Sequence, residues 1–176
     1  EGINTYRFDL ASQALYEFVW NEYCDWYLEF SKSALNDRGK SEEEKRGVLY
    51  TLVYILETSL RGLHPFIPFI TEELWHRVAP ILNKNSETIM LESYPSEDEF
   101  EKDNKADEEI EWVKSFIMGV RKIRSERDIP PGNELTVSTK GGTKQESEWL
   151  NKNELLIKML GKIEKIVMTK DEMSDA

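Results

Sequence analysis

Two prolines three residues apart, Pro65 and Pro68, constrain this chain more than any other feature. Each proline fixes its own φ, lacks a backbone N–H and disfavours helix at the residue before it. We therefore expect one long helix to end at Leu63 and the next to begin at about Thr71. Four large apolar side chains lie beside the prolines: Phe66, Ile67, Phe69 and Ile70. A solvated loop does not need such residues, so we expect them to pack in a core.

Apolar residues recur at steps of three and four along four stretches, a pattern that is typical of amphipathic helices. The stretches are residues 7–32, 41–63, 71–79 and 104–127. Ser41 with Glu44 three residues later predicts a capping box at the start of the second helix. The first helix carries a second aromatic stripe that includes Tyr16 and Trp20, so we expect neighbours on two of its sides. In the fourth helix we expect five residues to face inward: Ile110, Val113, Ile117, Val120 and Ile123.

The residues after the fourth helix have a different pattern. Leu135–Thr139 and Ile163–Thr169 have the composition of strands. Gly141 and Gly142 predict a turn, and we expect a helix over residues 145–160. This order makes a βαβ unit. Two strands and one helix are marginal alone, so we expect the unit either to lean on the bundle or to be truncated and lack further strands.

These elements predict a mainly α fold. We expect a helical bundle over residues 1–132, followed by a small α+β subdomain over residues 133–176. The short apolar run Ile89–Leu91 is expected to be a strand-like crossover along the bundle.

Composition limits the classes of function. A net charge of −11 over 176 residues argues against a general nucleic-acid binder, so any contact with a polyanion must be local. The single cysteine, Cys24, cannot form an internal disulfide, and with His64 and His76 it gives no zinc-ligand spacing. The sequence has no apolar run of about 18 residues and no signal-peptide pattern, so we expect a cytoplasmic protein without a membrane segment.

The sequence contains no phosphate-binding loop, nucleophile elbow, zinc-protease pair or dinucleotide fingerprint. We therefore expect no catalytic residue, no metal and no cofactor in this chain. One basic patch stands out at the end of the fourth helix, where Arg121, Lys122, Arg124 and Arg127 either complement the helix dipole or contact RNA phosphates. Lys114, Arg121 and Arg124 share one helical face, which favours phosphate contacts.

Three separated stretches resemble one family. The first, residues 6–29, ends in the motif Cys-Asp-Trp-Tyr-Leu-Glu; the second is the His-Pro corner at residues 64–75; the third, residues 120–132, contains Arg-Lys-Ile-Arg-Ser-Glu. Together they resemble the C-terminal anticodon-binding region of bacterial valyl-tRNA synthetase. The second and third patterns are similar to those of the isoleucine and leucine enzymes, whereas the Cys-Asp-Trp-Tyr-Leu-Glu motif points to valine.

The resemblance implies a class I synthetase helical bundle that receives the anticodon stem and loop of tRNA, followed by a small α+β subdomain. It also implies that this chain is a fragment of a ligase that attaches valine to tRNA. The catalytic and editing domains, with the sites for ATP and magnesium, would belong to the rest of the parent chain. The expected partners are valine-specific tRNA and that catalytic domain, with the protein a monomer. Two alternatives stay open: the equivalent module of an isoleucyl or leucyl enzyme, and a helical protein-interaction module without an RNA role.

Bundle geometry predicts where tRNA would be read, because antiparallel packing puts the end of the first helix beside the start of the second. Leu28, Glu29, Lys32 and Arg38 should share this pole, where they could contact an unpaired base and its flanking phosphates. The simpler interpretation is that Glu29 and Lys32 form an ordinary surface ion pair. The rival docking end is the opposite pole, where we expect Arg7 near the basic patch.

Overall fold

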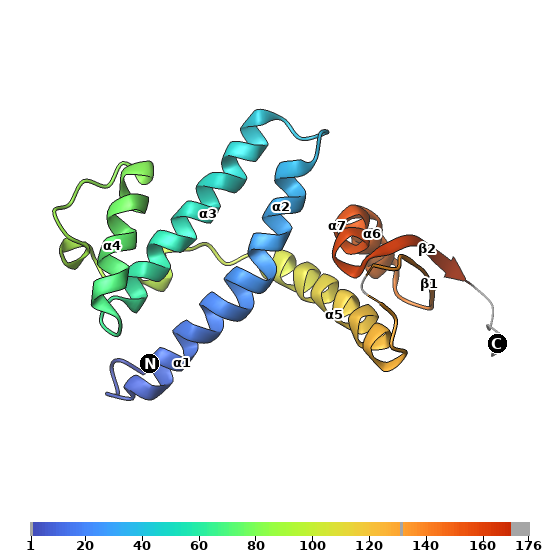
Figure 1. Cartoon of the computed structure of the whole chain (residues 1–176), viewed down its shortest axis with the longest axis horizontal. Coiled ribbons are helices and arrows are strands. Elements are labelled where there is room, and N and C mark those ends of the chain that lie inside the picture. The colour runs from blue at the N-terminus through green and yellow to red at the C-terminus, as the bar shows by residue number, and fades with distance from the viewer. Residues whose placement is uncertain (1, 131, 170–176) are drawn as a thin grey trace. The chain divides into compact units, whose positions relative to one another are not determined.

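The structure, a computed structural model, describes residues 2–130 and 132–169. Internal contacts divide the chain into two compact units, Glu1–Glu101 and Lys102–Ala176. The first unit is helical, and the second combines helices with two strands (Figure 1). The expected fold class, a mainly helical protein with a small α+β part at its end, is confirmed.

The first unit is built on a helical hairpin. Its first arm is one continuous helical run of three segments, α1 (Phe8–Glu17), η1 (Phe18–Tyr27) and α2 (Leu28–Asn36). The second arm, α3 (Glu42–Leu63), packs against α2 (Figure 1). The capping box at the start of α3 is confirmed, because the Ser41 side chain accepts from the Glu44 backbone N–H and the Glu44 side chain accepts from Ser41.

The middle segment η1 is a π-helix rather than an α-helix. A π-helix bonds each residue to the fifth one along, so faces drawn with the α-helical period of 3.6 residues drift across it. Tyr16 and Trp20 were expected to touch a neighbouring helix, but they are 61% and 56% exposed and stack on each other with ring centroids 6.3 Å apart. The prediction that a neighbouring helix contacts this second face is therefore wrong for Tyr16 and Trp20.

The proline corner ends α3 at Leu63, as expected, but α4 (Pro68–Val78) begins earlier than Thr71. Pro68 occupies the first helical position, where a missing N–H breaks no helical bond. The prediction that the apolar corner residues pack in a core is wrong for most of them, because Phe69 is 90% exposed and Ile67 and Ile70 are about half exposed. The buried stripe of α4 instead runs through Thr71 and Trp75.

The segment after α4 contains three short 3₁₀ turns: η2 (Ala79–Leu82), η3 (Ile89–Leu91) and η4 (Glu97–Glu99). The expected strand-like crossover at Ile89–Leu91 is thus wrong. Ile89 is nevertheless buried, and it forms the core of this unit with Leu60, Trp75 and Ala79. Ile89 is therefore buried from a 3₁₀ turn, without being part of a strand.

A buried carboxylate joins this segment to α3 and α4. Glu57, in the middle of α3, has no exposed surface. It accepts from Trp75 Nε1 at 2.9 Å, from Lys84 Nζ at 2.9 Å and from Arg61 Nε at 3.1 Å. Because each donor comes from a different place in the chain, one carboxylate holds three segments together.

Arg61 and Lys84 extend the network outward. The Arg61 guanidinium donates to the Ser93 carbonyl at 2.7 Å and to Glu99 at 2.7 Å. Lys84 lies 3.2 Å from Glu92. The segment from η2 to η4 is therefore fastened at several points by charge-assisted hydrogen bonds, which are stronger than neutral ones.

Replacing Glu57 by Gln should lower the free energy of unfolding of the first unit by about 3 to 5 kcal/mol, because Arg61 and Lys84 would lose their buried counter-charge. The matched control is Glu73→Gln, since the exposed Glu73–Arg77 pair contributes less than about 1 kcal/mol. Urea unfolding measures both changes. Equal effects would show that Glu57 does not hold the unit together.

The network also predicts a dependence on pH. The hydrogen bond from Arg61 lowers the pKa of Glu99, and the hydrogen bond from Ser86 lowers the pKa of Glu92, each below the ordinary 4.5. A carboxyl whose pKa is lowered by folding adds stability that is fully present above the unfolded pKa and is lost as the pH falls through the folded pKa. We expect the free energy of unfolding to decline below about pH 4.5. Glu99→Gln should make this decline shallower in denaturant titrations, whereas an unchanged slope would contradict the assignment.

The second unit contains α5 (Asn104–Glu126), β1 (Leu135–Lys140), α6 (Lys144–Lys152), α7 (Glu154–Gly161) and β2 (Ile163–Thr169). The strands pair in parallel, with Val137 opposite Ile166, so the βαβ order is confirmed. The single helix expected over residues 145–160 is broken at Asn153. The Asn153 side-chain amide donates to the Trp149 carbonyl at 3.0 Å and to Glu109 of α5 at 2.7 Å. These two bonds hold Asn153 in place between α6 and α7.

Helix α5 packs on α6 and α7 within this second unit. Val113 and Ile117 are fully buried, and Val120 lies beside Gly161 at the end of α7. Contacts within the chain thus divide it at residues 101 and 102, whereas the sequence suggested a boundary at 132 and 133. The apolar stripe of α5 indicates that this helix packs against another element. The stripe does not indicate that this element is α6 and α7 rather than the helices of the first unit.

Candidate nucleic-acid interface

The hairpin tip carries four of the predicted tRNA-binding residues. Leu28, Glu29 and Lys32 lie on α2, and Arg38 lies in the turn between α2 and α3. At about 1.5 Å of rise per residue, Leu28 and Lys32 are one helical turn apart. The structure therefore places these residues along one short stretch at the end of the hairpin.

The electrostatics of the tip are local and mixed in sign. Glu29 and Lys32 form an i, i+3 ion pair with both side chains partly exposed, as the simpler interpretation expects. Arg38 is exposed, and no side-chain partner for it lies among residues 2–130 and 132–169. Lys40 of the same turn lies 3.7 Å from Glu44.

Arg7 precedes α1 and is engaged by a nearby acid. Its guanidinium donates to both carboxylate oxygens of Asp9, at 2.9 Å and 2.6 Å. This bidentate pair raises the pKa of Arg7 and lowers the pKa of Asp9. Arg7 belongs to the first unit and the basic patch of α5 to the second.

The basic patch at the end of α5 separates into two kinds of residue. Lys122 and Arg127 are exposed, and Lys122 has a loose contact of 3.9 Å with Glu126. Arg121 is also exposed, and its Nη2 lies 3.5 Å from the Leu160 carbonyl. These three side chains carry their charges at the surface of the helix.

Arg124 is different because it is only 9% exposed. Its guanidinium donates to the carbonyls of Gly161 at 3.1 Å, Asn133 at 2.7 Å and Pro130 at 3.4 Å, and also to the Lys162 carbonyl. This placement leaves Arg124 little able to make the predicted phosphate contact, because carbonyls occupy four of its five N–H groups. Arg124 instead ties the end of α5 to the end of α7 and to the loop before β1.

Two of the three cations on the shared face, Lys114 and Arg124, are packed, whereas Arg121 is exposed. Lys114 and Arg124 are both among the buried residues of α5, whereas Ile123, which was expected inward, is 54% exposed. Lys114 is paired with Glu111 at 2.6 Å. Lys114 and Arg124 therefore have a packing role in this unit.

Substituting Arg124 by Met should destabilise the second unit by about 3 kcal/mol, because the Gly161 and Asn133 carbonyls would lose a charged donor. Arg127→Met removes an exposed cation from the same helix end and should change stability by less than about 0.5 kcal/mol. Hydrogen exchange of the α7 and β2 amides reports both effects. If Arg124→Met were as mild as its control, Arg124 would not hold these segments together.

A hollow of about 530 Å³ lies beside the buried Arg124 side chain. Arg121, Ser125 and Asp128 line it from α5 and the residues after it, and Lys162 lines it from the turn before β2. Lys162 was not predicted, since nothing in the sequence relates it to residues some forty positions earlier.

Residues 2–130 and 132–169 contain no group of three or more His, Cys, Asp or Glu side chains arranged to hold a metal ion. In the same ranges, no helix combines the length and apolar character that a membrane crossing requires.

Comparison with known proteins decides the family. A family model described as the anticodon-binding domain of tRNA ligase matches residues 1–139. This chain belongs to that family. A valine–tRNA ligase from Coxiella burnetii (strain RSA 493 / Nine Mile phase I) is 42% identical over 172 residues, which is 98% of this chain and 19% of that protein. The chain thus spans about a fifth of the length of this relative.

The anticodon-binding family match contains both candidate surfaces, the hairpin tip and the end of α5. It ends within β1, so most of the βαβ unit lies beyond it. The similarity to the valine–tRNA ligase continues through this unit, because it covers nearly the whole chain. The βαβ unit is therefore part of what this chain shares with that ligase.

Proposed function

We propose that this chain is the tRNA-binding module of a valine–tRNA ligase, whose parent enzyme attaches valine to tRNA using ATP. The 42% identity to a valine–tRNA ligase over 98% of the chain carries this proposal. The catalytic and editing sites, with ATP and magnesium, would belong to the rest of the parent chain. A cytoplasmic location and a monomeric state stay predictions.

The hairpin tip suits an anticodon loop because its ion pair is easily exchanged. An exposed pair such as Glu29–Lys32 contributes less than about 1 kcal/mol, so a phosphate can draw Lys32 away at little cost. The Glu29 carboxylate is then free to accept from the exocyclic amine of an unpaired base, with Leu28 against the base face. Arg38 supplies a second exposed cation for the RNA phosphates that flank this base.

The end of α5 supplies a second, sequence-independent contact. Lys122 and Arg127 are the phosphate ligands in this proposal, and Arg121 stands beside them. Arg124 contributes by holding the helix end in place rather than by touching RNA. Only a few cations are then needed, which suits a chain with a net charge of −11.

The direct test is a titration of labelled tRNA at two salt concentrations, with valine-specific and isoleucine-specific species compared. Replacing Lys122 and Arg127 together by Ala should reduce the slope of log affinity against log salt by roughly one to two units, as expected for two lost phosphate contacts. Lys144→Ala, which removes an exposed cation from α6, is the matched control and should leave the slope unchanged.

The outcomes separate the candidate functions. Tighter binding of valine-specific tRNA supports the proposal, and loss of discrimination against anticodon-substituted tRNA in Glu29→Ala would place recognition at the tip. Tighter binding of isoleucine-specific tRNA would favour the module of the isoleucyl or leucyl enzyme. Absence of tRNA binding by the full-length parent would favour a protein-interaction module, which the acidic charge of the chain suits.

A further inference from the structure

The hollow beside Arg124 gathers positive charge in one place. Three cations line it, Arg121 and Arg124 from α5 and Lys162 from the turn between α7 and β2, and Asp128 is the one carboxylate among its described lining residues. Ser125 also lines it, and its hydroxyl can donate a hydrogen bond. The volume of about 530 Å³ is within the usual range for ligand sites, about 300 to 1,000 Å³. In a chain with a net charge of −11, this excess of cations is local.

Backbone carbonyls at the end of α7 would by themselves repel an anion from this hollow. Arg124 offsets them, because its guanidinium donates to the carbonyls of Gly161 and Lys162 and to two carbonyls of the loop before β1. The charge of Arg124 is therefore largely balanced within the protein. An anion in the hollow would meet the other two cations, Arg121 and Lys162, both of which are exposed.

Lys162 occupies a backbone position that does not favour lysine. Its φ is +52°, in the left-handed region that glycine adopts most easily. It directly follows Gly161, the last residue of α7, at a position where many helices carry a glycine. Its carbonyl accepts from the Leu135 N–H at 3.2 Å and from Arg124, so the backbone is held here. Glycine would suit this turn at least as well, so the turn does not account for the lysine side chain.

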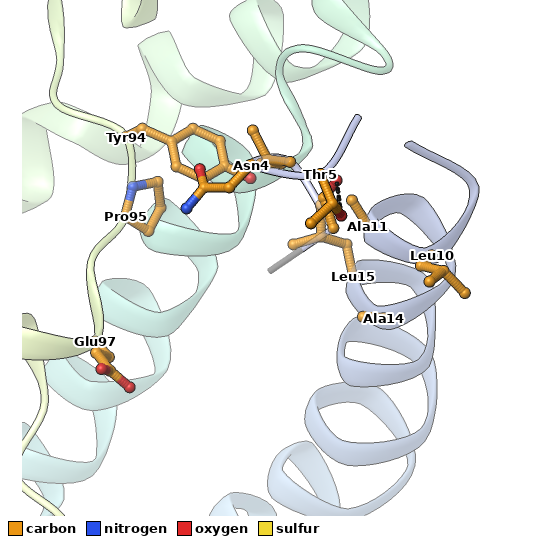
Figure 2. Close-up of a pocket in the computed structure, with 11 residues that line it drawn as sticks. Asn4, Thr5, Leu10, Ala11, Ala14, Leu15, Tyr94, Pro95 and Glu97 are labelled. Carbon is orange, nitrogen blue, oxygen red and sulfur yellow. Dashed lines mark hydrogen bonds between the residues drawn. The ribbon is translucent and has the colours of Figure 1, made fainter. Parts of the chain in front are cut away.

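Charge rather than size distinguishes this hollow. A larger one, of about 770 Å³, lies beside α1 in the first unit, with Leu15 on one side and Tyr94 on the other (Figure 2). Glu97 is the one charged side chain among the described residues around that larger hollow. An anion is therefore favoured at the hollow beside Arg124 and disfavoured at the larger one.

We propose that the hollow beside Arg124 binds one backbone phosphate of the bound tRNA, with Arg121 and Lys162 as its ligands. Continuity identifies the ligand, because Lys122 and Arg127 are exposed at the same helix end and an RNA strand presents a phosphate at each nucleotide. The βαβ unit then takes part in RNA binding, since it supplies Lys162. A phosphate contact carries no sequence information, so this site strengthens the binding of every tRNA alike. The inference rests on the proposed function, because a tRNA must supply the phosphate.

Salt dependence of tRNA binding in the full-length parent tests this contact. Lys162→Gln should reduce the slope of log affinity against log salt by about one unit, for valine-specific and anticodon-substituted tRNA alike. Lys162→Arg keeps the charge and should keep the slope. Lys165→Gln is the matched control, because Lys165 is an exposed lysine of β2 that does not line the hollow. An unchanged slope in Lys162→Gln, or an equal change in its control, would overturn the inference.

Chemical modification distinguishes an RNA phosphate from a free one. Saturating tRNA should protect the Lys162 amine of the parent from acetylation and leave the Lys165 amine reactive, because a bound phosphate holds the Lys162 amine in a charge-assisted hydrogen bond. Inorganic phosphate at the same ionic strength should protect Lys162 less than tRNA does. Protection by inorganic phosphate but not by tRNA would overturn the inference in favour of a site for a small free anion.

The two proposals fail in different ways. If tRNA binds and Lys162→Gln leaves the salt slope unchanged, the phosphate site is refuted and the proposed function stands. If the full-length parent does not bind tRNA at all, both are refuted.

Discussion

The first unit depends on one buried carboxylate. A carboxylate without exposed surface is costly unless its oxygens are fully hydrogen-bonded, and Glu57 meets this condition with donors from α3, α4 and the segment after η2. That segment contains little regular structure, so its position depends on Lys84 and on the reach of Arg61 to Ser93 and Glu99.

In the second unit, a buried cation joins separate segments, as the Glu57 carboxylate does in the first. Arg124 satisfies backbone carbonyls at the end of α7 and before β1, where helix and strand ends would otherwise leave acceptors unpaired. The cations of α5 therefore divide by burial into a structural group, Lys114 and Arg124, and an exposed group that includes Lys122 and Arg127. Burial rather than residue type decides which of them can meet a phosphate. A protein with a net negative charge can still present cations at the few places where a polyanion would dock.

The two candidate surfaces divide the proposed work of RNA binding. The hairpin tip offers a carboxylate and an apolar side chain that can tell bases apart, together with cations held by weak surface pairs. The end of α5 offers charge without base-reading groups.

The sequence alone determined the local elements of this protein: the end of α3 at Leu63, the Ser41 capping box and the βαβ order. These follow from proline geometry, capping side chains and apolar periodicity, all of which act within a few residues. Only the tertiary structure decided which faces are buried. The π-helical segment shifted the faces around Trp20, Arg124 took an inward position in place of Ile123, and Phe69 turned outward. Burial depends on partners distant in sequence, and periodicity reports the presence of a face but not what covers it.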